Sequence, residues 1–437
     1  MNESPTWALI ARSPMHVRQF LLVVLCCLIN MTDGYDMLSL ALAGPQLRKE
    51  WGVPPQLMGI ALSATSVGIV LGSFLVARLS DRFGRRPVML AALLIVTVAH
   101  ACCAVATSIW EIGVLRLGLG VALGTLVVSL NVLVAEFSND RWRNVLLAFG
   151  HVGFSLGMAV SGGIAAWVLE PYGWRYIFIG GAVLNLALLL LSAVFLLESP
   201  EYLSVRQPPN ALARINAILT LLRRPPLESL PPLPGGKPPK TRVAALLAPQ
   251  LRQVSILVWI ASLSFAVVGY FLLSWNPQIL VNAGMTPTQA SYIVIINAAF
   301  GTLGHLSMAY LSRWVEETRL TAIYFALMAV MLVAFGTVPA SLPVLLGASG
   351  VLTLFTVGSY TGLFLVAVKF YSTETRNVGV GCVVGWQRVG SIVGPMLGGL
   401  LIGANLDRVM TLVVFAAIAV VPVMSMSWAA RTRSGVS

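Results

Sequence analysis

Long apolar runs alternate with short polar connections along the whole chain. A run of about 20 apolar residues is long enough to cross a bilayer core about 30 Å thick as a helix. Twelve such runs occur, and each predicts one membrane-spanning helix. They start near Gln19, Leu57, Val88, Ile109, Val145, Arg175, Leu251, Thr288, Leu320, Leu342, Asn377 and Val409.

One polar stretch divides these runs into two groups of six. Nine prolines fall between Pro208 and Pro239, and one short surface helix is expected there, over residues 211–222. This stretch is a linker, because proline cannot continue a helix or a strand ladder. The predicted domains are a six-helix half over 1–198, a cytoplasmic linker over 199–250 and a second six-helix half over 251–437.

The two predicted halves are similar in sequence. The stretch "LGSFLVARLS", which starts at Leu71, aligns with "LGHLSMAYLS", which starts at Leu303. The pair Arg143–Asn144 recurs as Arg376–Asn377 at nearly the same offset. This pattern indicates an internal duplication, and duplicated helical bundles with a binding site between them are typical of transporters.

Composition agrees with a membrane protein. Of the 437 residues, 57% are hydrophobic and only 10% are charged, whereas roughly a quarter of an ordinary soluble protein is charged. We therefore predict an all-α integral membrane protein. All five cysteines lie within predicted spans and no CxxC or zinc-like spacing occurs, so neither a disulfide framework nor a metal or cofactor site is expected.

The net charge of +12 at first suggests a nucleic-acid partner, but its distribution indicates membrane orientation. Of the 28 lysines and arginines, 22 fall on the side that holds both termini and the loops after even-numbered helices. Basic residues collect on the cytoplasmic side of membrane proteins. We therefore expect both termini to be cytoplasmic and expect no nucleic-acid partner.

The loop after the second predicted helix reads "GSFLVARLSDRFGRRPVML". Its glycines permit tight turns and close helix approach, and its acid among basic residues can form charge pairs that break and re-form when two halves move. A basic loop that only obeys the orientation rule is the alternative. The predicted gating residues are Gly72, Asp81, Arg82, Gly84, Arg85 and Arg86.

This loop resembles the signature of the major facilitator superfamily, and "RLGLGVALG", which starts at Arg116, resembles its second motif. Three further stretches, "DGYD", "YFLLSWNPQILVNAGM" and "VVGWQRVGSIVGPMLGG", are similar to the aromatic acid:H⁺ symporter family. The resemblance implies the facilitator fold in a bacterial inner membrane. It further implies a monomer that imports a small aromatic carboxylate, of the benzoate or hydroxybenzoate type, together with protons by alternating access.

The second half departs from the signature. Arg313 stands where the first half has Asp81, and Trp314, Glu316 and Glu317 follow it. Any charge pairing at the gate is therefore expected to differ between the halves.

Two acids lie where hydrocarbon is expected. Asp33 and Asp36 are three residues apart in the first predicted span, so they share one helix face. Buried acids tend to take up protons, which makes this pair the predicted proton-coupling site. Arg116 lies at a depth close to that of Asp36, so the two side chains can pair; the alternative is a permanent structural bridge.

The resemblance points to Arg388 as the group that holds the substrate carboxylate. It lies near the middle of the eleventh predicted span, and a guanidinium fork suits a planar carboxylate. Aromatic and amide groups near it in the pattern are candidates to contact a flat ring, although packing is the alternative for each aromatic. The full predicted substrate set is Arg388, Arg116, Tyr35, Trp386, Gln387, Tyr270 and Trp275.

Other functions have less support. A membrane enzyme would need a nucleophile with a base or a metal-ligand cluster, and none stands out; a sensor would normally need a signalling domain. Within the transporters, the alternatives are a carrier of another small organic acid, such as nicotinate, a dicarboxylate or shikimate, or a drug exporter.

Overall fold

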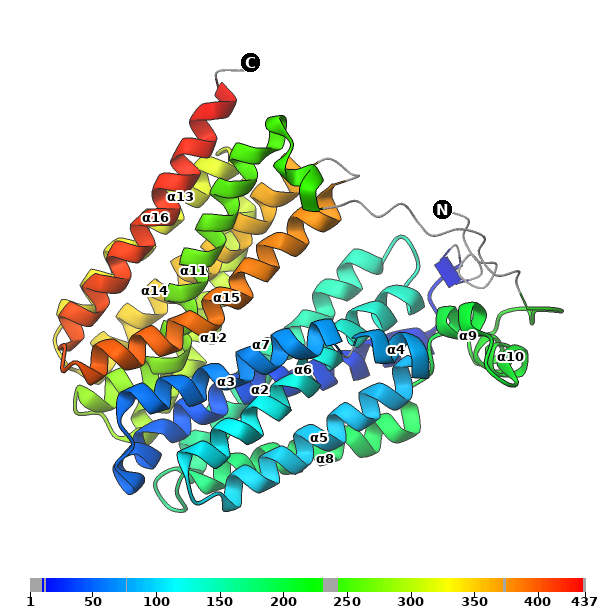
Figure 1. Cartoon of the computed structure of the whole chain (residues 1–437), viewed down its shortest axis with the longest axis horizontal. Helices are drawn as coiled ribbons and strands as arrows, with labels where there is room; N and C mark the ends of the chain where they lie inside the picture. The colour runs from blue at the N-terminus through cyan, green and yellow to red at the C-terminus, as the bar shows by residue number, and fades with distance from the viewer. Residues whose placement is uncertain (1–9, 12, 76, 231–242, 372–374, 435–437) are drawn as a thin grey trace. The chain divides into compact units, whose positions relative to one another are not determined.

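The apolar runs form α-helices in the computed structural model, which describes residues 10–11, 13–75, 77–230, 243–371 and 375–434. Figure 1 shows the chain coloured along its length. The long helices are α2 (Val17–Trp51), α3 (Pro55–Leu75), α5 (Arg85–Val105), α6 (Ile109–Phe137), α7 (Arg143–Val168), α8 (Arg175–Phe195), α11 (Pro249–Asn282), α12 (Pro287–Leu311), α13 (Glu317–Thr337), α14 (Leu342–Phe370), α15 (Arg376–Gly403) and α16 (Arg408–Ser434).

These twelve helices correspond to the twelve predicted spans. Among the described residues, eleven of the helices are long and apolar enough to cross a membrane. The twelfth, α15, has 28 residues but is less apolar, because it contains Gln387, Arg388 and several glycines. Four shorter elements complete the description: α4 (Ala77–Phe83), α9 (Pro200–Arg206), α10 (Ala211–Leu221) and the 3₁₀ helix η1 (Val243–Leu247). The surface helix predicted at 211–222 is thus confirmed as α10.

Several helix starts follow from local chemistry. Thr286 and Gln289 form a capping box at the start of α12, in which each side chain accepts from the other residue's backbone N–H, and this satisfies donors that have no intrahelical partner. Pro249 and Pro287 stand in the first turns of α11 and α12, where a missing N–H costs nothing.

The contacts divide the chain into two compact units. Unit 1 comprises residues 1–39, 67–161 and 175–239, and unit 2 comprises residues 40–66, 162–174 and 240–437. In unit 1, α5 packs against α6 and α8 (Figure 1), around a core that includes Leu93, Leu123 and Leu133. The division into halves at 1–198 and 251–437 stays a prediction.

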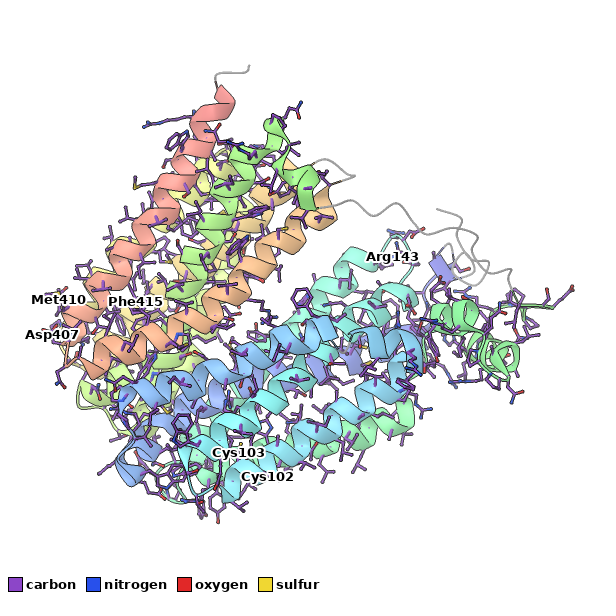
Figure 2. The ribbon with its side chains drawn as sticks, viewed as in Figure 1. Cys102, Cys103, Arg143, Asp407, Met410 and Phe415 are labelled. Atoms are coloured by element: carbon purple, nitrogen blue, oxygen red, sulfur yellow. The ribbon has the colours of Figure 1, made fainter. Side chains whose placement is uncertain are left out.

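Unit 2 is held by α11, which packs against α15 and α16, and by the neighbouring pairs α12–α14 and α13–α16. Asp407 caps α16 by accepting from the Met410 backbone N–H at 2.7 Å, and Phe415 follows on the same helix (Figure 2). The Phe415 ring stacks on Phe271 of α11 with the centroids 3.6 Å apart.

Gly72 lies at a close approach of α3 and α6 in the signature region. A Cβ atom there would lie 2.1 Å from the carbonyl oxygen of Val121, so the backbones must separate to accept any side chain. We predict that Gly72→Ala lowers the stability of the protein by about 1–3 kcal/mol, the usual cost of overpacking. The measurement is the thermal unfolding midpoint of the purified protein in detergent.

Gly118 of α6 provides the matched control, because a Cβ atom there would meet nothing within 4 Å. Gly118→Ala should leave the midpoint unchanged or raise it, since alanine favours helix more than glycine does. Equal midpoints for the two variants would show that the α3–α6 contact is not constrained by Gly72.

Candidate functional site

Helix α2 places both predicted acids inside unit 1. The Asp36 side chain is fully buried and Asp33 is 8% exposed. Burial of an ionised carboxylate is costly unless charged or hydrogen-bonding groups compensate it, so the partners of these acids determine what they can do.

Arg116 of α6 compensates Asp36. Its Nη1 donates to Asp36 Oδ1 and its Nη2 to Oδ2, each at 3.1 Å, and both side chains are almost completely shielded from solvent. This is the two-pronged geometry in which arginine binds carboxylates most strongly. The predicted pairing of Asp36 with Arg116 is confirmed.

Further contacts tie the same arginine to α2. Nη1 also donates to Ser39 Oγ and Nη2 to the backbone carbonyl of Asp36, both at 3.1 Å. The Ser39 hydroxyl in turn donates to the Asp36 carbonyl at 2.9 Å. The Arg116 guanidinium thus binds both side-chain and backbone oxygens in one turn of α2.

A histidine that the sequence analysis did not select completes this cluster. His100 of α5 is fully buried, and its Nε2 lies 3.7 Å from Asp36 Oδ1. The ring contacts Tyr35 edge-on at 5.9 Å and Phe178 at 6.4 Å between centroids. A single histidine in an otherwise apolar run was the available signal, because polar residues inside membranes usually have functional roles.

Tyr35 lies between the two acids in sequence and is also fully buried. Its hydroxyl donates to the backbone carbonyl of Ile177 in α8 at 2.6 Å. The Tyr35 hydroxyl is therefore hydrogen-bonded to α8, and it is the Tyr35 ring that contacts His100 in the cluster.

The predicted substrate residues of unit 2 lie on two adjacent helices, α11 and α15. Trp275 of α11 is buried, and its indole N–H donates to the Pro395 carbonyl of α15 at 3.0 Å, so this side chain joins the two helices. Trp386 is 39% exposed and its ring lies 6.4 Å from that of Trp259. Gln387 is 6% exposed, and within the described residues its Nε2 has no hydrogen-bond partner.

Arg388 and Tyr270 share a neighbour that the sequence analysis missed. Both lie within electrostatic range of the Tyr360 hydroxyl of α14. The Tyr360 ring also lies 6.2 Å from Phe265 and 6.4 Å from His305. Unit 2 thus gathers a cation, two phenols and further rings, a combination suited to a flat anionic molecule.

In the signature loop, Gly84 has a φ of 102°, a conformation that residues with side chains rarely adopt. The backbone N–H groups of Arg85 and Arg86 donate to Glu198 Oε1 at 2.7 and 3.2 Å. Glu198, from the stretch "LLESPEYL", was not predicted as a site residue, and it places a carboxylate at the positive end of α5.

Arg82 and Arg86, which lie on either side of Gly84, make different contacts. Arg86 Nη2 donates to the Ala193 carbonyl at 2.7 Å, and the Arg82 carbonyl accepts from the Tyr202 hydroxyl at 3.2 Å. The side chain of Asp81 lies outside the described part of the structure.

The corresponding loop of the second half has its own charge pairs. Lys369 Nζ lies 3.2 Å from Glu316 Oε1 and also contacts Glu317. Burial alone would raise the pKa of Glu316, but the hydrogen bond and charge of Lys369 and the hydrogen bond from the Arg319 backbone N–H help to outweigh it, so the pKa is lowered. Lys369 was not selected from the sequence, because it lies at the far end of α14, more than 50 residues from its partners.

A metal or cofactor site was not expected, and the described residues contain no group of three or more His, Cys, Asp or Glu side chains that could hold a metal ion.

Known proteins resemble this chain over nearly its full length. It is 28% identical to the gallate transporter of Pseudomonas putida, over 96% of this chain and 94% of that protein. It is 29% identical to the 4-hydroxybenzoate transporter of the same organism, over 95% of this chain and 94% of that protein.

Among solved structures, the D-xylose-proton symporter matches with a TM-score of 0.73 at 16% identity, over 93% of this chain and 97% of that one. This likeness confirms the predicted facilitator fold. The sequence model of the Major Facilitator Superfamily matches residues 24–367, and the chain therefore belongs to this superfamily of transporters.

Proposed function

We propose that this protein imports a small aromatic carboxylic acid, of the benzoate or hydroxybenzoate type, together with protons by alternating access. The observation that supports the substrate class most directly is similarity over 95–96% of the chain to transporters named for gallate and 4-hydroxybenzoate. Since the superfamily consists of transporters, the chain is a multi-pass membrane protein rather than an enzyme.

Proton coupling is assigned to the acids of α2. Asp36 is fully buried and bound by both prongs of Arg116. Protonation of a carboxylate removes the charge that such a pair requires. A proton at this position would therefore weaken the link between α2 and α6, and in this way proton occupancy changes the relative free energies of two helix arrangements. Asp33, one turn earlier, is the second acid of this proposal.

Substrate binding is assigned to the charged and aromatic side chains of unit 2. Arg388 binds the carboxylate of the substrate, Tyr270 and Trp386 contact its ring, and Gln387 supplies an amide. Trp275 contributes by holding α11 against α15. In unit 1, Arg116 and Tyr35 complete the predicted set.

The signature loop is proposed as a cytoplasmic gate. Its arginines and the left-handed Gly84 lie at the junction of α4 and α5, where Glu198 binds the start of α5. Asp81 would form the charge pairs that open and close with each cycle. We place both termini in the cytoplasm, the protein in a bacterial inner membrane, and the functional unit as a monomer.

The test is uptake of labelled 4-hydroxybenzoate by proteoliposomes that contain the purified protein. An imposed inward proton gradient should drive accumulation, and a protonophore should abolish it. Unlabelled gallate and benzoate should compete, whereas succinate, nicotinate and shikimate should not. Competition by one of the latter three alone would assign the protein to another organic acid, and outward pumping of a cationic dye would indicate a drug exporter.

A further inference from the structure

In the cluster around Asp36, the imidazole of His100 has one ring nitrogen to which no role has yet been assigned. His100 Nδ1 lies 3.1 Å from the carbonyl oxygen of Val96. A carbonyl only accepts hydrogen bonds, so Nδ1 carries the hydrogen and, in the neutral ring, Nε2 is a bare acceptor. Nε2 is buried and has no hydrogen-bond partner among the described residues.

This bare acceptor faces another acceptor. Nε2 lies 3.7 Å from Asp36 Oδ1, beyond the usual hydrogen-bond range of about 2.7–3.2 Å. Oδ1 already accepts one hydrogen bond from Arg116 and has a second lone pair available. A proton on Nε2 would make it a donor to that lone pair, and the two atoms would then attract each other.

Groups from several helices surround the ring. From α2 it meets Tyr35 and Asp36, and the negative charge of Asp36 attracts a proton to the ring. From α6 the Arg116 charge acts in the opposite direction, and from its own helix Cys103 lies within electrostatic range of Asp36 and Arg116. From α8 it meets Phe178 and Gly181, where a Cβ atom would lie 2.4 Å from the ring. A glycine at this place leaves space for the histidine at the depth of the acid.

We propose that His100 and Asp36 together form the proton-binding site, in which the transported proton resides on His100 Nε2 and is shared with Asp36 Oδ1. The inference rests on the proposed proton-coupled function and specifies where the proton is held. The step is a proton association in which no other covalent bond forms or breaks. Because the proton is shared with Oδ1, which also accepts from Arg116, it weakens the link between Asp36 and Arg116. The proton is later released from the same nitrogen to the opposite side of the membrane.

Charge balance explains how this site couples to an anion. Within the group of Asp36, Arg116 and His100, the charges of Asp36 and Arg116 cancel, so the added proton leaves one net positive charge on these three side chains. A carboxylate substrate brings one negative charge, and in a medium of low dielectric constant the two charges stabilise each other over long distances. By linkage, substrate then favours proton binding as much as the proton favours substrate binding.

The first test compares two His→Asn variants in proteoliposomes, with substrate uptake and substrate-induced proton uptake measured together. His100→Asn keeps an amide near the Nδ1 position but lacks Nε2. We expect downhill 4-hydroxybenzoate uptake to persist while the uptake of protons that accompanies it is lost. His151→Asn, the control in the same unit, should keep the parental ratio.

An unchanged proton ratio in His100→Asn overturns the inference, and so does an equal loss of both fluxes, since that would indicate a structural role only. Measurements on the parent protein test the proposed function separately from the role of His100. If the parent takes up no aromatic acid, or takes it up without protons, the proposed function fails before His100 is at issue.

A second measurement does not depend on altering His100. The chain has four histidines, so replacing His16, His151 and His305 by Gln leaves His100 as the sole histidine. In the ¹⁵N spectrum of that protein, adding substrate at a fixed pH should convert the ring from the neutral to the doubly protonated form. Adding Asp36→Asn should abolish the conversion. A ring that stays neutral with substrate bound would overturn the inference.

Discussion

Asp36→Asn should abolish accumulation of substrate against its gradient. One pH unit corresponds to about 1.4 kcal/mol, or about tenfold accumulation for each proton coupled, and the variant should reach only equal concentrations inside and outside. The physical reason is that an amide can neither bind nor share a transported proton, while Arg116 loses the negative charge and one of the two carboxylate oxygens that it now contacts. Steady-state uptake in proteoliposomes under an imposed pH gradient measures the effect.

Loss of folding must be distinguished from loss of coupling in this variant. Removing one partner of a buried ion pair costs about 3–5 kcal/mol, whereas replacing both partners is often nearly neutral. The double variant Asp36→Asn/Arg116→Gln should therefore regain thermal stability without regaining accumulation. Asp140→Asn makes the same chemical change at a side chain that is 59% exposed, and it should accumulate substrate as the parent does. Accumulation by the double variant would disprove the coupling role of the pair.

Arg388→Ala should remove the preference of the protein for an aromatic acid over its uncharged amide. A hydrogen bond to a charged group contributes about 1.5–3 kcal/mol, which corresponds to an affinity change of about 10–100-fold. Arg388→Lys keeps the charge but loses the planar fork, so its loss should be intermediate. The measurement is the ratio of dissociation constants for benzoate and benzamide with purified protein in detergent.

The control for Arg388 is Arg252→Ala, at an exposed arginine in the first turn of α11, which should leave the acid-to-amide ratio unchanged. If a well-folded Arg388→Ala protein keeps the parental ratio, the carboxylate is bound by another group.

The helices were predictable because a bilayer requires apolar runs of a definite length. The runs expected to start at Ile109, Arg175 and Leu342 start at those residues, and the linker helix expected at 211–222 ends one residue earlier. The apolar run that starts near Gln19 was expected to end near Ala43, whereas α2 continues to Trp51. The additional turns, which include Arg48 and Lys49, are helical but polar. Apolar content alone does not detect such an extension.

The site was predictable only in part, because residues far apart in sequence meet through helix packing. The pairing of Asp36 with Arg116 followed from their similar depths. His100 stood out only as a histidine in an apolar run, and that signal does not show which helix its side chain faces. Glu198 and Tyr360 were missed for a related reason: each acts on a partner from another helix, and the sequence does not specify which helix faces are opposed.

The contacts of Tyr35, Asp36 and Arg116 have a mechanical consequence. Water drives apolar helix faces together in soluble proteins, but lipid tails are as apolar as leucine, so such faces can slide past one another at little cost. Hydrogen bonds from Tyr35 to α8 and from Arg116 to α2 resist that sliding, because each holds only at one axial offset. They constrain the axial alignment of three helices, so loss of the Arg116 contacts would remove one constraint on α6 while the Tyr35 contact would still align α2 with α8.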